Sequence, residues 1–160
     1  MKIFLTVGTH PQQFDRLVKA VDAIAGKNRK TQVFGQVGSS SYKPKFFPFK
    51  EFIVEPEYSA KFMEADVIVS HGGAGAIIHA MKHRKRLVIV PRLKEFGEHT
   101  NNHQKELAEL LEKHGKAIAV NGMQELEQAL DKAKKFTPKF DSSRKKLIEG
   151  LEKWFMAVGG

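Results

Sequence analysis

The sequence of 160 residues contains no cysteine. This absence excludes disulfide bonds, thiolate metal sites and a cysteine nucleophile, and it fits a reducing compartment. Long apolar runs are also missing, because the uncharged stretch 67–81 holds three glycines, two histidines and a serine and is too short to span a bilayer. No charged and apolar leader opens the chain. We therefore expect a cytoplasmic protein, or one at the cytoplasmic face of a membrane.

Basic residues outnumber acidic residues by 27 to 18, and the excess is unevenly distributed. Residues 1–50 contain nine Lys and Arg against two Asp, whereas residues 51–104 contain seven of each sign. Residues 132–146 add seven basic residues against one Asp. This pattern fits an anionic partner, such as a nucleic acid, an acidic membrane surface or a phosphorylated substrate, and it equally fits a solvated lysine-rich surface.

Short apolar runs alternate along the chain with segments of helical periodicity. Strands are expected at 3–7, 31–37, 51–54, 66–70, 86–90 and 117–120, with helices at 14–25, 58–65, 76–82, about 99–114 and 121–134. The alternation predicts the α/β class, with a single Rossmann-like domain whose parallel sheet is flanked by helices. We place this domain at 1–135. An amphipathic helix capped by Asp141 or Ser142 follows within 136–160, and it either packs on the same domain or docks on a partner.

The clearest ligand-binding pattern is the turn His71-Gly72-Gly73-Ala74-Gly75, which joins a buried strand to a helix. Glycines allow the backbone to approach a ligand closely, and a helix N-terminus offers free N–H groups with a partial positive charge. The pattern suits a phosphate or diphosphate. A tight turn that needs only small residues is the alternative.

Two further segments follow predicted strands and should reach the same edge of the sheet. The turn Gly8-Thr9-His10 supplies backbone amides and a hydroxyl donor, although Thr9 could equally begin a helix. Segment 91–104 concentrates two His, two Asn, a Gln and an Arg, more hydrogen-bonding groups than a loop and a helix cap require. The hydroxyl groups of a sugar would use such groups.

A metal site is not expected. His99 and His103 have the spacing of one helix face, but no glutamate lies between them as in a zinc-protease motif. No Asp-x-Asp pair is present to hold a divalent ion against a diphosphate.

Taken together, strand-H-G-G-A-G-helix, V-P-R and F-G-E-H-x-N-x-H-Q resemble the C-terminal, donor-binding domain of family 28 glycosyltransferases, which forms half of a GT-B fold. The similarity covers about residues 1–131. It extends to stand-alone versions of this domain. These are the cytosolic subunit of the dolichol-linked N-acetylglucosaminyltransferase and the second subunit of capsule and exopolysaccharide glycosyltransferases.

The resemblance implies a UDP-sugar site. The two glycine turns would hold the diphosphate, backbone near Glu55 would meet the uracil edge, and His103 with Gln104 would read the sugar hydroxyls. The donor-binding residues carried over are Gly8, Thr9, His10, Glu55, His71, Gly72, Gly73, Ala74, Gly75, His79, Arg92, Glu98, Asn102, His103 and Gln104. Better-known members have a ribose-binding Glu at the position of His79. This histidine therefore either binds the ribose or is a packed helix residue.

The resemblance also implies what the chain needs from elsewhere. A GT-B enzyme has a second domain for the acceptor, and in this family a separate membrane-anchored subunit supplies it, with a lipid-linked acceptor. Inverting transfer needs a base. We expect that base on the partner, and His10 is the only local candidate. The family implies no cofactor and no metal.

The alternative function is a non-catalytic module that binds nucleotides or nucleic acid, and the basic N-terminal region supports it. The sequence has neither an RNP-like aromatic motif nor a basic recognition helix, so we do not expect a nucleic-acid partner.

Overall fold

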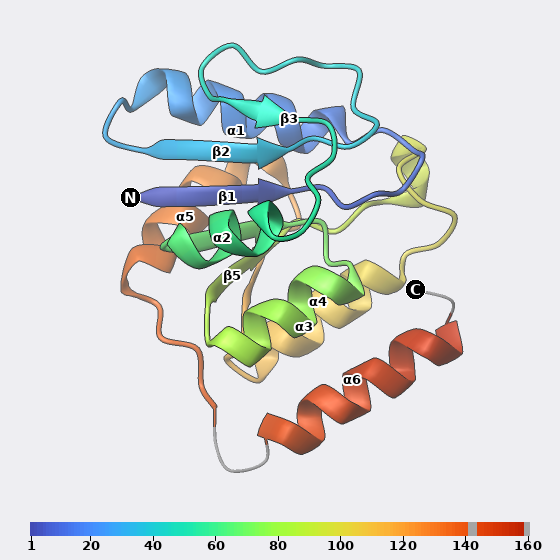
Figure 1. Ribbon diagram of the computed structural model, residues 1–160. Coiled ribbons are helices and arrows are strands. Elements are labelled where there is room, and N and C mark those ends of the chain that lie inside the picture. The colour runs from blue at the N-terminus through green and yellow to red at the C-terminus, as the bar shows by residue number, and fades with distance from the viewer. Residues whose placement is uncertain (141–143, 159–160) are drawn as a thin grey trace.

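Six parallel strands form one sheet in the computed structural model, which describes residues 1–140 and 144–158 (Figure 1). The strands are β1 (Lys2–Thr6), β2 (Gln32–Gln36), β3 (Phe49–Lys50), β4 (Val67–Ser70), β5 (Arg86–Ile89) and β6 (Ile118–Ala119). Their order is β3-β2-β1-β4-β5-β6, so the sheet grows in opposite directions from β1 and β4. The predicted fold class is confirmed. Ligands bind such sheets at the carboxyl ends of the strands, beside this switch point.

Helices cover both faces of the sheet because its strands are apolar on both sides. In β1, Ile3 and Leu5 face one core, whereas Phe4 faces the other. The first core contains residues of α1 and α5, and the second contains residues of α2, α3 and α4. The helices are α1 (Asp15–Lys27), α2 (Glu57–Glu64), α3 (Ala74–His83), α4 (His103–Lys113), α5 (Leu126–Lys135) and α6 (Arg144–Val158).

Helix α6 lies against α3 on the outer side of the domain (Figure 1). Its residues Ile148, Leu151 and Phe155 are buried in the second core. Of the two placements that the sequence left open, the structure therefore has α6 on its own domain. Asp141 and Ser142, expected to cap this helix, lie outside the described residues.

Several element boundaries differ from the expectation, and two of them have a clear structural cause. The third strand is Phe49–Lys50 rather than 51–54, because β2 pairs with the chain directly after Pro48: the Gly35 N–H donates to the Pro48 carbonyl at 3.1 Å. Asn121 does not cap a helix, since a single 3₁₀ turn, Met123–Glu125, comes before α5. No described helix is both long and apolar enough to cross a bilayer.

Candidate functional site

Two cavities open beside the carboxyl ends of β1 and β4. The larger, which we call the main cavity, has a volume of about 390 Å³, and the smaller side cavity has about 170 Å³. They share His10, Gly73, His99 and Gln104 as lining residues. The turns after β1 and β4 and the loop before α4 therefore meet at one place, as their positions after strands suggested.

The ring of His71 is clamped between the two glycine turns. A Cβ atom at Gly8 would lie 2.5 Å from its Cε1, and one at Gly73 would lie 2.1 Å from its Nε2. Gly8 has a φ of +75°, which side-chain-bearing residues rarely adopt. The glycines predicted to bring the backbone to a ligand thus also make room for this imidazole.

His71 is an uncharged group in the folded protein. Burial, followed by the positive charge of Arg92, lowers its pKa to about 3. Its Nδ1 lies 3.3 Å from the Thr6 carbonyl oxygen, which can only accept a hydrogen bond, so Nδ1 carries the proton. The Nε2 atom consequently keeps a lone pair and acts as an acceptor.

The protonation of His71 predicts a loss of stability in acid. The folded-state pKa lies below the unfolded value, so the unfolded chain takes up the proton first as the pH falls below about 6.5. The free energy of unfolding should then decline toward pH 3, and His71 should contribute about 1.4 kcal/mol per pH unit. In His71→Asn, which keeps the donor to Thr6, urea unfolding should show a shallower decline between pH 6 and pH 4. Equal slopes in wild type, His71→Asn and the exposed-site control His114→Gln would contradict this assignment.

Arg92 is a buried brace between loops and does not line either cavity. Its Nη1 donates to the carbonyls of Gln12, Gln13 and Glu98 at 2.9–3.1 Å, and its Nη2 donates to that of Val7 at 2.8 Å. The guanidinium also lies 4.8 Å from the centroid of the Phe14 ring. The expectation that the Arg92 side chain contacts the donor is therefore corrected: it fixes the loop after β1 against the loop after β5.

Glu98 is also placed behind the cavity walls. It is 1% exposed, and its carboxylate accepts bonds from Arg16 Nη2 at 2.8 Å and from the Leu93 N–H at 3.1 Å. The expected donor contact of Glu98 is corrected in the same way. The Nη atoms of Arg92 and the carboxylate of Glu98 are engaged by protein partners, whereas the Nε of Arg92 is buried without one. Both residues therefore position the site without lining it.

His10 and His99 form a stacked pair where the cavities join, with ring centroids 5.0 Å apart. Burial lowers the pKa of both, assisted by Arg92 for His10 and by the neighbouring His10 for His99. Each Nδ1 accepts a backbone N–H, from Gln12 at 3.2 Å and from Asn101 at 3.3 Å. Each ring thus carries its proton on Nε2 when neutral, and both can donate a hydrogen bond there.

Gln104 lines both cavities, and its side-chain orientation is fixed. Its Oε1 accepts the Arg92 backbone N–H at 3.1 Å, which leaves the amide NH₂ as the donor. His103 lines the side cavity together with Trp154 and Phe155 of α6. Sequence analysis missed this role of α6, since helical periodicity identifies an apolar stripe without indicating which cavity it closes.

The start of α3 forms one wall of the main cavity through Ala74, Gly75 and Ala76. Gly73 precedes the helix with no side chain to cap it, and the first N–H bonded to Gly73 is that of Ile77, at 3.2 Å. The first-turn N–H groups are therefore without helical acceptors. They are suited to an anion.

Among residues 1–140 and 144–158, no three His, Asp or Glu side chains are grouped as metal ligands would be.

The match to known families decides what kind of domain this is. Residues 2–153 match the model of the glycosyltransferase family 28 C-terminal domain. The chain belongs to this family.

Relatives of this family 28 domain include human and mouse "UDP-N-acetylglucosamine transferase subunit ALG13", which are 32% and 33% identical to it over 124 residues. The aligned region is 71% of this chain and 10% of each ALG13 protein. The chain thus spans about a tenth of the length of these curated relatives.

Solved structures place the same domain among GT-B glycosyltransferases. The ALG13 solution structure matches with a TM-score of 0.61 and 17% identity, over 94% of each chain. The glycotransferase of kitacinnamycin matches with a TM-score of 0.65 and 19% identity, and the match covers 99% of this chain and 40% of that one. MurG of Acinetobacter baumannii matches with a TM-score of 0.56 and 17% identity, and the match covers 94% of this chain and 49% of that one. These similarities show the fold.

Besides Arg92 and Glu98, three residues carried over from the family lie outside both cavities. Asn102 is exposed and accepts the Lys94 N–H at 3.0 Å, and Glu55 accepts the Ser59 N–H at 3.3 Å. The ring of His79 packs 4.3 Å from that of Phe62, with its Nε2 buried and unpaired. This position matches the packed-helix alternative. Asn102 does not line either cavity, although its neighbours Asn101 and His103 line the side cavity. Backbone near Glu55 was expected at the uracil edge, and Ile53, two residues before Glu55, lines the main cavity.

Sequence analysis also missed Gln36 and Tyr58, which line the main cavity. Gln36 is 3% exposed, and its Nε2 donates to the Gly8 carbonyl at 3.4 Å while its Oε1 accepts the Ile53 N–H at 3.0 Å. A glutamine at the end of an apolar strand was the available signal. Tyr58 had none beyond its place in an amphipathic helix.

Proposed function

We propose that this family 28 domain binds a UDP-sugar and is the donor half of a two-subunit, inverting, metal-independent glycosyltransferase. The observation that supports this most is the main cavity, where the free N-terminus of α3 meets two glycine turns in a domain of this family. The similarity to ALG13, named as a UDP-N-acetylglucosamine transferase subunit, supports a UDP-linked donor. The sugar would pass to a lipid-linked acceptor in polysaccharide or glycolipid synthesis.

The chemical task of the domain would be to stabilise the departing diphosphate. Negative charge develops on UDP as the glycosidic bond to it breaks, and preorganised donors aimed at that charge lower the barrier. Backbone N–H groups of Ala74 and Gly75 and the α3 dipole would supply this stabilisation. The Nε2–H groups of His10 and His99 would add two donors where the cavities join. These groups would perform the role that a divalent ion has in metal-dependent transferases.

We assign the base to the partner subunit. The Nδ1 of His10 is already occupied as an acceptor, and its neutral ring offers a donor at Nε2, so it suits a phosphate better than an acceptor hydroxyl. The partner would also bind the lipid-linked acceptor and keep this subunit at the cytoplasmic face of the membrane. The purified chain should therefore bind donor yet transfer no sugar until the partner is added.

The side cavity would hold the sugar, next to the Gln104 amide and His103. Trp154 is the only tryptophan of the chain, so its fluorescence reports on this cavity. A UDP-sugar should change the Trp154 emission, whereas UDP alone should leave it nearly unchanged. In Gln104→Ala, the affinity for the UDP-sugar should fall about tenfold, because one hydrogen bond to a sugar hydroxyl is lost, and that for UDP by less.

The matched control is Gln124→Ala, which removes the same amide outside both cavities. Equal losses for UDP and UDP-sugar in Gln104→Ala would contradict a sugar site at this glutamine. An identical emission change with UDP and UDP-sugar would contradict the proposal that the side cavity holds the sugar.

A further inference from the structure

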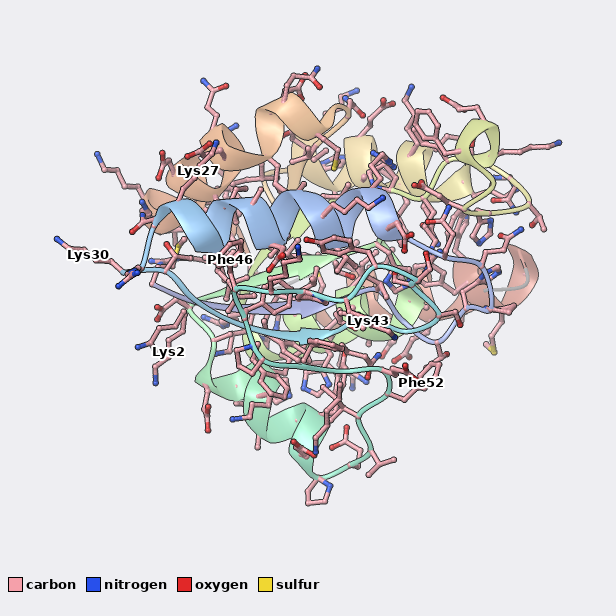
Figure 2. The ribbon with its side chains drawn as sticks, turned by 90° about the horizontal axis from the view of Figure 1, so that it is seen from above. Lys2, Lys27, Lys30, Lys43, Phe46 and Phe52 are labelled. Carbon is pink, nitrogen blue, oxygen red and sulfur yellow. The ribbon has the colours of Figure 1, made fainter. Side chains whose placement is uncertain are left out.

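One side of the domain is basic and carries exposed phenylalanines (Figure 2). Figure 2 looks onto the β2–β3 edge of the sheet. The labelled residues on this side are Lys2, Lys27, Lys30, Lys43, Phe46 and Phe52. Phe46 is 62% exposed and Phe52 is 50% exposed. With Arg29 and Lys45, these six residues define what we call the basic aromatic face.

The two aspartates of residues 1–50 do not pair with the cations of the face, because loop groups occupy their carboxylates. Asp22 is 1% exposed and accepts bonds from the Tyr42 hydroxyl at 2.7 Å and the Phe46 N–H at 2.8 Å. Asp15 accepts bonds from the backbone N–H groups of Ser41 and Tyr42. The two aspartates of residues 1–50 thus hold the loop that presents Lys43, Lys45 and Phe46.

Part of the positive charge on the face is uncompensated. Lys43 pairs with Glu51 at 2.7 Å, and Lys27 lies 3.6 Å from Glu127. Among residues 1–140 and 144–158, no ion pair within 4.0 Å is formed by Lys2, Arg29, Lys30 or Lys45. Four free cations therefore surround Phe46 and the edge of the sheet.

Phe46 stands at the mouth of a groove of about 610 Å³ at the amino ends of β1 and β2. Its ring lies on Gly26, where a Cβ atom would come within 2.8 Å of it. Phe34 and Pro48 line the groove, and Lys2 and Arg29 are at its edge. The groove shares no lining residue with the donor cavities. The charged residues that line the groove are Lys2, Arg29, Lys61 and one acidic residue, Glu64. Exposed apolar rings beside a mainly basic groove form a surface suited to a lipid interface.

We propose that the basic aromatic face binds an anionic lipid bilayer directly, with Phe46 in the interface and the free cations over the headgroups. The composition of the face favours lipid over nucleic acid: five of its six cations are lysines, point charges that suit a diffuse anionic surface, whereas nucleic-acid recognition exploits the fork of arginine. The face runs along the strands. A bilayer laid against it would meet the strands side-on and leave their carboxyl ends facing sideways (Figure 1).

This inference does not depend on donor binding, and vesicle flotation of the full chain tests it. Wild type should float with vesicles of equal parts phosphatidylglycerol and phosphatidylcholine, and not with phosphatidylcholine alone. Because salt screens exposed charges, added salt should weaken binding. Each lysine near an anionic surface contributes about fivefold, so Lys30→Gln/Lys45→Gln should bind about 25-fold more weakly. Phe46→Ala should also weaken binding, with retained salt dependence.

The matched control is Lys113→Gln/Lys153→Gln, which removes two exposed cations from α4 and α6 and gives the same net charge. This control should bind as wild type does. Equal losses in the two double variants would show that net charge alone is responsible and would overturn the proposal, as would equal flotation with both lipid compositions. Displacement of wild type from vesicles by a short single-stranded DNA, with DNA binding lost in Phe46→Ala, would assign the face to nucleic acid instead.

Discussion

Replacing Arg92 by methionine should destabilise the protein by about 3–5 kcal/mol, the cost of removing one side of a buried charged network. The guanidinium is fully buried and donates to four carbonyl oxygens, including those of Val7 and Gln12. Methionine fills similar space but leaves these carbonyls unpaired in the protein interior. Chemical unfolding at neutral pH measures the loss, and nucleotide binding should disappear with it.

Two control variants distinguish the loss of this hydrogen-bond network from a general effect of losing an arginine. Arg29→Met, at an exposed position, should change the stability by less than about 0.5 kcal/mol. Arg92→Lys keeps the charge but not the fork of donors, so it should recover only part of the loss. Stability within about 1 kcal/mol of wild type in Arg92→Met would show that the loops after β1 and β5 hold their positions without it.

Gly73→Ala should cost about 2–3 kcal/mol and abolish nucleotide binding. The backbone angles of Gly73, φ −74° and ψ 151°, suit any residue, so strain in the main chain is not the cause. The new methyl group would lie 2.1 Å from Nε2 of His71. That ring has no room to retreat toward Gly8, so it must swing into the main cavity, where the diphosphate is expected.

Gly75→Ala, two residues along the same turn, provides the matched comparison. A Cβ atom at Gly75 meets nothing within 4 Å and lies in the first turn of α3. Alanine there should stabilise the helix by about 0.5 kcal/mol. Thermal unfolding should therefore rank Gly75→Ala above wild type and Gly73→Ala below it. Equal effects of the two substitutions would contradict the clamp around His71.

The fold could be predicted from the sequence because its strands are short apolar runs and its helices have an apolar stripe. The third strand was misplaced at 51–54, because the strand that forms, Phe49–Lys50, has only two residues. Such an edge strand depends on the carbonyls of a neighbouring segment, as in the Gly35 bond to Pro48. No local pattern of side chains predicts that backbone pairing.

The candidate site was predictable where function depends on the backbone. Gly8 and Gly73 follow strands, and parallel strands bring their carboxyl ends to one edge. The candidate site was not predictable where its geometry depends on contacts between residues that are far apart in the sequence. The partners of Arg92 are carbonyl oxygens, which every residue has, and Val7 is 85 residues away. An arginine beside a ligand loop was therefore interpreted as a ligand group although it is a buried brace.

Calorimetric titration of the purified chain with UDP, beside UMP and GDP, tests the central claim most directly. The account predicts that UDP binds at least tenfold more tightly than UMP, since the second phosphate meets the N–H groups of α3, and more tightly than GDP. It also predicts the same affinity with EDTA as with magnesium, and none in Gly73→Ala. UDP and UMP affinities that are equal, or binding that requires magnesium, would contradict a diphosphate site built from backbone donors.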